Sequence, residues 1–337
     1  MQTDASTITG TYQDGGTQTA FILHINADGT LTLTEDVPLQ HLDPTNPNDT
    51  LDLSGLVNAT ITVTDYDGDS ASGSVGIGGN VVFYDDGPSV TVVAGSDANV
   101  ILETHDALTI GSASDTDSST ANFGGVFSIG SSSGGADGAA STVWSFSLGA
   151  VDHTDSGLTQ AGNTIYLYQL ANGSVVGSTS GTEAGVNAAN TVFGVTVDST
   201  GVVTLTQYSE IDHPLPGSTS GPYDSQTISL ADGLVTLTGT ATVTDNDGDS
   251  ATGSQTINIG ANLVFADDGP SVTNVVAGGS VSVDETTAGS PAGFPISATS
   301  STAVISATTS VGADTPGSTS YGLTITGGSG TSSGLAT

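Results

Sequence analysis

Two copies of an acidic segment contain the residues whose spacing most clearly suggests chemistry. TDYDGDSASGS at 64–74 and TDNDGDSATGS at 244–254 agree at nine of eleven positions. In each copy three carboxylates stand at i, i+2 and i+4, and they are Asp65, Asp67, Asp69, Asp245, Asp247 and Asp249. On a straight strand this spacing places them on one face, about 7 Å apart at each step, where they repel. The Gly between them lets the chain curl so that the oxygens converge, and hard oxygen ligands of this kind suit Ca²⁺.

The spacing differs from that of an EF-hand loop, so any calcium would be bound in another kind of loop. Gly is fourth rather than sixth in the motif, and the twelfth positions are Gly76 and Thr256 instead of Glu. A solvated turn is the alternative interpretation, because Asp and Gly are common turn residues. Recurrence of the motif in a chain without other cations favours calcium.

A second acidic motif follows each copy. Asp85-Asp86-Gly87-Pro88 recurs as Asp267-Asp268-Gly269-Pro270, and a Glu follows eighteen residues after the first Asp of each, at Glu103 and Glu285. Proline stiffens such a connector. We predict that Asp85, Asp86 and Glu103, and likewise Asp267, Asp268 and Glu285, hold an ion between neighbouring domains. An ordinary linker turn is the alternative.

Composition limits the partners and the chemistry. The 337 residues contain no Lys, no Arg and no Cys, against 35 Asp plus Glu, so the formal charge is -35. Nucleic acid and anionic membrane surfaces are excluded as partners, because phosphate contacts need Lys or Arg. Disulfides cannot supply rigidity. No nucleophile elbow and no cofactor loop is present, so we expect no enzyme, no catalytic residues and no cofactor other than Ca²⁺.

Histidine is scarce, and two of the five His recur. His41 and His213 occupy the same repeat position, beside Asp43 and Asp212 respectively. A nearby carboxylate could make either imidazole catalytic or a metal ligand. A loop His with a local hydrogen bond is the expectation.

The matched motifs divide the chain into repeats. Asp85 and Asp267 are 182 residues apart, and shorter offsets upstream, such as 172 between Phe21 and Phe193, indicate small insertions in loops. We predict the C-terminal part of a repeat at 1–87, one complete repeat at 88–269 and the N-terminal part of another at 270–337. The complete repeat is either one elaborated β-sandwich or two small ones.

The local patterns predict strands throughout. TITVT at 60–64 and TLTGTATVT at 236–244 alternate with period two, as half-buried strands do. Asn172-Gly173 predicts a hairpin, and so do the four-residue loops in FILHI–NADG–TLTLT and FGVTV–DSTG–VVTLT. About a dozen short strands in a repeat predict an all-β fold of tandem β-sandwiches. No apolar run approaches the ~20 residues of a membrane span, and the polar residues after Met1 suggest that the ends are those of a fragment.

The paired segments VTDYDGDSASGS…FYDDGPSV and VTDNDGDSATGS…FADDGPSV resemble the tandem repeats of giant RTX-type bacterial surface adhesins. The resemblance implies type I secretion and immunoglobulin-like sandwich extenders in an elongated array. It also implies that the DGD and DDGP aspartates bind Ca²⁺, chiefly near domain junctions, and stiffen a stalk that supports cell adhesion and biofilm formation.

These observations predict a non-enzymatic extender on the extracellular bacterial surface, whose partners are neighbouring repeats of the same chain. Two alternatives stay open. One is a module that binds glycans or other cell surfaces, with the loop at 209–225 as its contact face. The other is a homopolymer in which adjacent chains complete each other's sandwich by adding strands.

Overall fold

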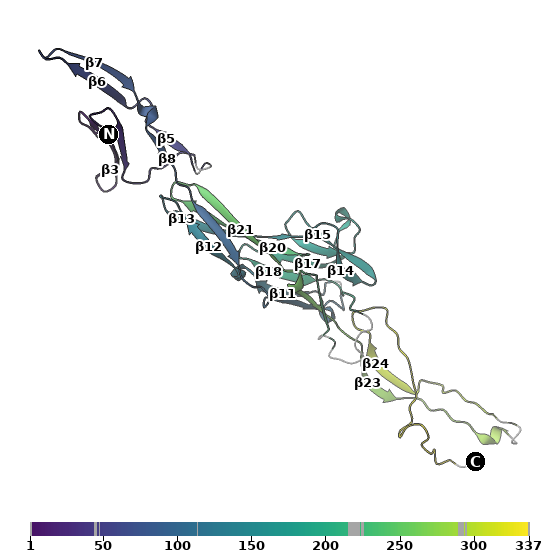
Figure 1. Ribbon diagram of the computed structural model, residues 1–337. Coiled ribbons are helices and arrows are strands. Elements are labelled where there is room, and N and C mark those ends of the chain that lie inside the picture. Colours follow the sequence, from purple (N-terminus) through teal and green to yellow (C-terminus); the bar gives the residue numbers. More distant parts are fainter. Residues whose placement is uncertain are drawn as a thin grey trace.

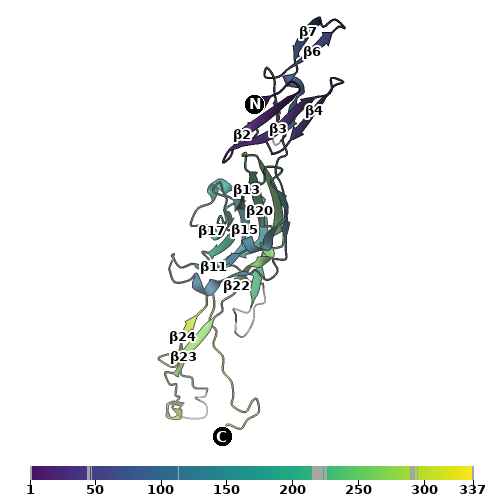
Figure 2. The same cartoon turned by 90° about the vertical axis from the view of Figure 1, so that its left-hand side faces the viewer.

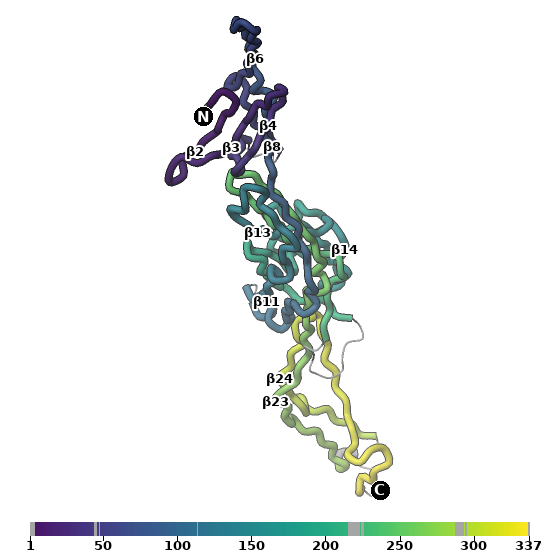
Figure 3. Tube along the Cα trace, turned by 60° about the vertical axis from the view of Figure 1, so that its left-hand side comes forward, coloured from purple at the N-terminus to yellow at the C-terminus, as the bar shows by residue number. Residues whose placement is uncertain are grey.

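The computed structural model describes residues 2–43, 46, 48–112, 114–214, 223, 226–288, 293 and 295–335. The molecule is a long rod of β-structure with the two termini towards opposite ends (Figures 1 and 2). Three parts follow one another along it in sequence order (Figure 3). The described helices are all short 3₁₀ turns, so the all-β prediction is confirmed. Among the described residues, no helix has the length and apolarity needed to cross a membrane.

The first part contains strands β1 to β8. An antiparallel sheet has the order β1-β2-β3-β4, and the pairs β5–β8 and β6–β7 are separate from it. Their bounds are Gln2–Thr3, Thr7–Gln13, Thr17–Ile25, Leu31–Glu35, Thr50–Asp52, Asn58–Thr64, Ser70–Gly76 and Val82–Tyr84, with a 3₁₀ turn η1 at Gly78–Asn80. A small core centres on Phe21 and Phe83, whose ring centroids are 5.0 Å apart.

The central part contains strands β9 to β22, which enclose one hydrophobic core running from Val92 to Phe265. A six-stranded sheet, β11-β18-β17-β16-β15-β14, contributes to this core together with β9–β12, β13-β20-β21 and β10-β22-β19. The pairing of β10 with β22 is parallel. The bounds are Ser89–Ala94, Leu102–His105, Asp117–Asn122, Phe127–Ser133, Ala139–Gly149, Thr154–Gln160, Asn163–Gln169, Val175–Ser178, Thr191–Val197, Val202–Gln207, Thr227–Ser229, Thr236–Asp245, Ser250–Asn258 and Leu263–Ala266. The 3₁₀ turns η2, η3, η4 and η6 lie at Asp106–Leu108, Gly124–Val126, Glu183–Gly185 and Gly260–Asn262.

The third part contains the antiparallel pair β23, Ser271–Ala277, and β24, Ile305–Ser310, with the 3₁₀ turn η7 at Glu285–Ala288 between them in sequence. This pair repeats the first three residue pairs of β9–β12: Ser271 lies opposite Ser310 as Ser89 lies opposite Ser133. Every residue of β23 and β24 is exposed.

The three predicted hairpins are present as β3–β4, β15–β16 and β17–β18. Equivalent aromatic pairs support the matching of the copies, since Phe193 and Phe265 lie 5.1 Å apart as Phe21 and Phe83 do. In both places a glycine of the neighbouring strand lies against the ring, Gly10 against Phe21 and Gly177 against Phe193. A Cβ at either glycine would clash with the ring.

The two predicted alternating strands have different environments. β20 alternates between partly buried and buried residues along its whole length, as a core strand does. β6, the matching strand, is mostly exposed on both faces. The prediction of a half-buried strand therefore holds for β20 but not for β6, because in the central part β9, β12 and β13 pack onto β20–β21, whereas β6 pairs only with β7 among the described strands. The β6–β7 hairpin extends beyond the rest of the rod (Figure 1).

Candidate metal centres at the junctions

The second DGD segment forms a closed turn, which we call the inner turn, Asp245–Asp249. It joins β20 to β21, and the backbone N–H of Asp245 donates to the carbonyl of Asp249 at 3.0 Å. Gly248 N–H donates to Asp245 Oδ1 at 3.0 Å, and Gly248 has a φ of 111° that other residues rarely adopt. One carboxylate oxygen each of Asp245, Asp247 and Asp249 lies within 4.8 Å of the other two. The predicted curl and convergence of the DGD motif are therefore present.

The connector from the first part meets this turn. Asp85 follows β8, and it forms a second group with Asp137 and Asp247 whose ligand atoms also lie within 4.8 Å of one another. Asp137 is brought there by β13, in which Ala139 lies opposite Asp245. His41 of the first part donates its backbone N–H to Asp247 Oδ2 at 3.3 Å. We call Asp85, Asp137, Asp245, Asp247 and Asp249 the first junction cluster.

The carboxylates of this cluster have few partners for their charge. Asp245 and Asp249 are each 2% exposed. Buried oxygens without a hydrogen-bond partner are Asp85 Oδ2, Asp245 Oδ2, Asp247 Oδ1 and Asp249 Oδ2. Uncompensated buried carboxylates are costly, and a divalent cation would satisfy several of these oxygens at once.

The pKa shifts of these carboxylates reflect the same lack of compensating charge. Burial, followed by the hydrogen bond and charge of Asp85, raises the pKa of Asp249 to about 6. Burial and the neighbouring Asp247 raise the pKa of Asp245 and of Asp137 as well. In the absence of an ion, Asp249 therefore keeps its proton to a higher pH than an exposed carboxyl group does.

The first DGD segment, the outer turn Asp65–Asp69, has the same local geometry. Asp65 Oδ1 accepts hydrogen bonds from Gly68 N–H at 3.1 Å and Asp69 N–H at 2.8 Å. Its three carboxylates also lie within reach of a common ion, but all three are exposed. The outer turn therefore has the same turn geometry, but no neighbouring part of the described chain buries it.

The second DDGP connector has its own acidic surroundings, at the boundary of the central and third parts. Asp267 lies in a group with Asp106 and His213, and both Oδ atoms of Asp268 accept Ala313 N–H at 2.9 Å. Burial and the charges of Asp106 and Asp267 raise the pKa of Asp314 to about 6. We call Asp106, His213, Asp267, Asp268 and Asp314 the second junction cluster.

Both recurring His lie in these junctions. His213 Nδ1 makes the expected local hydrogen bond, to the Ile211 carbonyl at 2.9 Å. It also faces Asp106 Oδ2 at 3.4 Å and Asp267 Oδ1 at 3.6 Å. Burial lowers the pKa of His213, but the hydrogen bonds to Asp106 and Phe265 and the two negative charges outweigh it and raise the pKa to about 9.

His41 pairs with Asp49 and lies in a group with Asp49 and Asp85. The carboxylates that face these imidazoles come from other parts of the sequence. Asp212 instead accepts the backbone N–H groups of Ala161 and Gly162, each at 2.8 Å.

The fold does not build the predicted pairing of Glu103 with Asp85 and Asp86. β10 pairs in parallel with β22, so Glu103 lies opposite Val264, three residues before Asp267. Its carboxylate lies 3.5 Å from His105 Nε2. Glu285 is exposed at the start of η7, and Asp86 is exposed, its carbonyl oxygen lying against Gly135.

Sequence reasoning missed several residues that the structure brings together, namely Asp49, Asp106, Asp137 and Asp314. One signal was available: GAD at 135–137 recurs as GAD at 312–314, and each copy contacts a DDGP connector through its first residues. Most of the loop at 209–225, expected as a glycan contact face, lies outside the described residues.

The sequence matches a family model described as Domain of unknown function (DUF5801), over residues 1–78 and 99–260. The chain belongs to this family. The two matched DUF5801 segments end at Gly78 and Gly260, which are 182 residues apart and begin the equivalent turns η1 and η6.

Comparison with other proteins adds little to the family assignment. No curated protein matches the chain. A solved structure described as "Crystal structure of tetra-tandem repeat in extending region of large adhesion protein" is similar at 15% sequence identity. The similarity covers 81% of this chain and 69% of that chain, with a TM-score of 0.11, which is too low to bear on fold or function.

Proposed function

We propose that the chain is a non-enzymatic extender segment of a secreted bacterial surface adhesin, in which Ca²⁺ at the junctions fixes successive domains end to end. One observation carries the proposal: five carboxylates from both sides of the first junction converge, with buried oxygens that accept no hydrogen bond. The chain contains no Lys or Arg that could neutralise them. A rod of this kind, exported by type I secretion and held outside the cell, would support adhesion and biofilm formation.

Calcium fits the first junction cluster by chemistry and by ligand number. The ligands are all hard oxygens, and five carboxylates with carbonyls and water can supply the six to eight that Ca²⁺ takes. Asp85 comes from the connector, whereas Asp245, Asp247 and Asp249 come from the far end of the central part in sequence. An ion bound to both would restrict bending between the parts. At the second junction, Asp267, Asp268 and Asp314 offer the corresponding carboxylates.

Thermal unfolding of the whole chain in EDTA and in millimolar Ca²⁺ tests the proposal. At a hundred times the dissociation constant, each occupied site stabilises the folded state by about 2.7 kcal/mol. We expect a higher midpoint in Ca²⁺ and, by small-angle scattering, a longer and less variable rod. An unchanged midpoint and an unchanged scattering profile would reject calcium-dependent stiffening.

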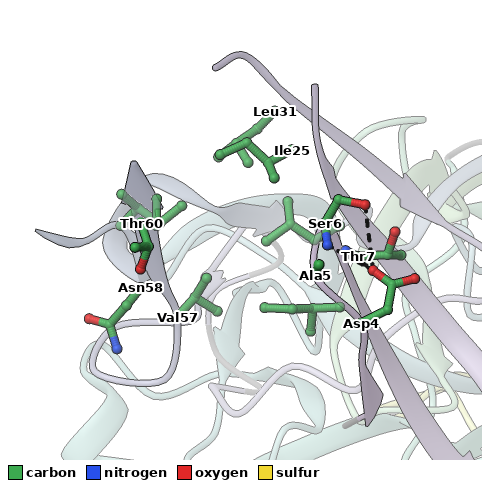
Figure 4. Close-up of a pocket in the computed structure, with 13 residues that line it drawn as sticks. Asp4, Ala5, Ser6, Thr7, Ile25, Leu31, Val57, Asn58 and Thr60 are labelled. Carbon is green, nitrogen blue, oxygen red and sulfur yellow. Dashed lines mark hydrogen bonds between the residues drawn. The ribbon is translucent and has the colours of Figure 1, made fainter. Parts of the chain in front are cut away.

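A second candidate function, head-to-tail assembly, is favoured by an open core in the first part. A pocket of about 230 Å³ lies between β3–β4 and the start of β6, lined by Leu23, Ile25, Leu31, Val57 and Ile77 among others (Figure 4). The equivalent core of the central part is filled from β12 and β13; for example, the Phe127 ring lies against Gly239 of β20.

The third part carries the matching apolar side chains, and they are exposed. Tyr321, Leu323 and Ile325 correspond to Trp144, Phe146 and Leu148 of β13 at an offset of 177. Their exposures are 79%, 98% and 63%, whereas Leu148 is 3% exposed. The third part of one copy could therefore complete the first part of another by adding strands.

Light scattering over a concentration series tests assembly separately from calcium binding. We expect mass to rise with concentration, and Leu323→Asp to abolish the rise without changing the melting of the central part. A constant monomer mass would reject it.

A further inference from the structure

The His side of the second junction has a geometry that differs from an all-oxygen calcium site. His213 Nδ1 lies 3.4 Å from Asp106 Oδ2 and 3.6 Å from Asp267 Oδ1. A tetrahedral ion with bonds of about 2.0–2.1 Å spaces its ligand atoms about 3.4 Å apart. The two distances from Nδ1 are therefore close to the edge length of a tetrahedral site, and the ligand atoms of the three residues lie within 4.8 Å of one another.

The two carboxylate oxygens are buried. Asp106 is 0% exposed and Asp267 is 7% exposed, and neither Asp106 Oδ2 nor Asp267 Oδ1 accepts a hydrogen bond beyond its ion-pair contact with His213. Both are directed at the imidazole. Two buried oxygens and one imidazole nitrogen thus face a common ligand position.

Surrounding groups fix the orientation of each candidate ligand. Asp106 Oδ1 accepts hydrogen bonds from Gln207 Nε2 and from Ile211 N–H, the latter at 3.1 Å, which directs Oδ2 towards His213. His213 Nε2 lies 3.2 Å from the Phe265 carbonyl. Donation from the remote ring nitrogen to a backbone carbonyl is the usual way in which a metal-binding His is held.

We propose that His213 Nδ1, Asp106 and Asp267 form a site for a borderline divalent cation such as Zn²⁺, next to the calcium position of the second junction and sharing Asp267 with it. Imidazole suits Zn²⁺, whereas Ca²⁺ takes oxygen ligands. In the metal-free state Nδ1 carries a proton that is donated to Ile211 O. That proton leaves when the metal binds.

The first junction contains the same combination. His41 groups with Asp49 and Asp85, and Asp85 corresponds to Asp267. The third ligand has a different origin in the two copies, because the β5–β8 and β19–β22 registers make Gln226 the counterpart of Asp49. Where that position lacks a carboxylate, Asp106 supplies one from another loop. Asp85 also contacts the acidic group of Asp137 and Asp247, so a carboxylate shared by two cation positions is part of the arrangement.

Titration of the whole chain with Zn²⁺, in buffer that contains saturating Ca²⁺, tests this site. Calorimetry in buffers of different ionisation enthalpy should show two Zn²⁺ per chain and proton release on binding. We expect His213→Gln and the isosteric Asp106→Asn each to weaken one of the two sites by at least about tenfold. His153→Gln is the matched control, because His153 stacks on Tyr166 away from both clusters.

His41→Gln gives an independent reading at the other junction, should a variant in the central core fail to fold. The double variant His41→Gln/His213→Gln should bind no Zn²⁺ tightly. Unchanged Zn²⁺ binding in that double variant, or full displacement of Zn²⁺ by Ca²⁺, would overturn the proposal. Neither result would affect the calcium-dependent melting that tests the extender function.

Discussion

The inner turn and the outer turn have nearly the same sequence and share two internal hydrogen bonds, yet only the inner turn is buried. In both, the first Asp accepts the backbone N–H of the Gly three residues later. The inner turn is buried against Asp85 and Asp137, whereas the outer turn is exposed at the tip of its hairpin. The motif alone makes a turn. The candidate metal centre needs the connector of the neighbouring part.

The strands behind the two turns differ in the same way. β6–β7 and β20–β21 share a register, with Thr64 opposite Ser70 and Thr244 opposite Ser250. Val63 is 66% exposed on β6, while its counterpart Val243 is 0% exposed. A hairpin of this sequence is therefore formed locally, and its burial depends on the segment that carries β9 to β13.

The largest expected contrast comes from placing a charge at these two Val. Val243→Asp buries an unpaired carboxylate and should destabilise the central part by about 4 kcal/mol or more. Val63→Asp should change stability by less than about 0.5 kcal/mol in the monomer. Denaturant unfolding followed by the fluorescence of Trp144, the one Trp of the chain, reports the central part, and far-ultraviolet circular dichroism reports the whole rod. Equal effects of the two substitutions would contradict the difference in burial.

Removing charge from the two turns should give a contrast whose sign depends on calcium. In Ca²⁺, Asp247→Asn/Asp249→Asn should lose about 2.7 kcal/mol of ion-dependent stability at saturating ion. In EDTA the same variant should be more stable than the parent chain, because buried repulsion is removed. The matched control Asp67→Asn/Asp69→Asn should change little in either condition. Loss of stability in EDTA as well would show that the inner carboxylates stabilise the turn without an ion.

The sequence predicted the local geometry of the turns well and the assembly of the candidate site only in part. Asp, Gly and the strand alternation are local signals, and β20, the three hairpins and the converging carboxylates follow from them. Asp137 and Asp106 could not be assigned in this way, because their place depends on the pairings β13–β20 and β10–β22 over long sequence separations. Glu103 shows the opposite error, a contact that was predicted but is absent. The constant spacing of eighteen residues suggested that Glu103 lies near Asp85, but the parallel pairing of β10 with β22 places it opposite Val264.

The pH dependence of stability offers a smaller contrast, with a defined sign. The pKa of Asp249 is raised from 3.8 to about 6, so the folded state binds more protons than the unfolded state between these values. Without metal, stability is therefore highest below about pH 4 with respect to this group and is lost as pH rises to about 6. The loss should be at most about 3 kcal/mol, since the pKa is raised by about two units and one pKa unit corresponds to about 1.4 kcal/mol.

Melting in EDTA from pH 4 to pH 7 measures this loss, and Asp249→Asn should flatten it while Asp69→Asn should not. His213, whose pKa is raised from 6.5 to about 9, loses its contribution only at higher pH. The stabilisation by Ca²⁺ should be greater at pH 7 than at pH 5. The opposite order would mean that Asp249 does not hold a proton in the metal-free fold.

The smallest effect should come from replacing the Gly of each turn by Ala, and it should be equal in the two turns. It tests whether the two turns have the same local structure despite their different burial. Gly68 has a φ of 99° and Gly248 a φ of 111°, where a Cβ costs about 1–2 kcal/mol. No atom lies within 4 Å of a Cβ placed at Gly68, so backbone strain alone should set the cost of Gly68→Ala. Gly248→Ala should cost a similar amount in EDTA, measured as the shift in each part's unfolding by circular dichroism. A much larger cost at Gly248 in EDTA would show that contacts with the neighbouring part determine the conformation of the inner turn. The two turns would then not be the same local structure.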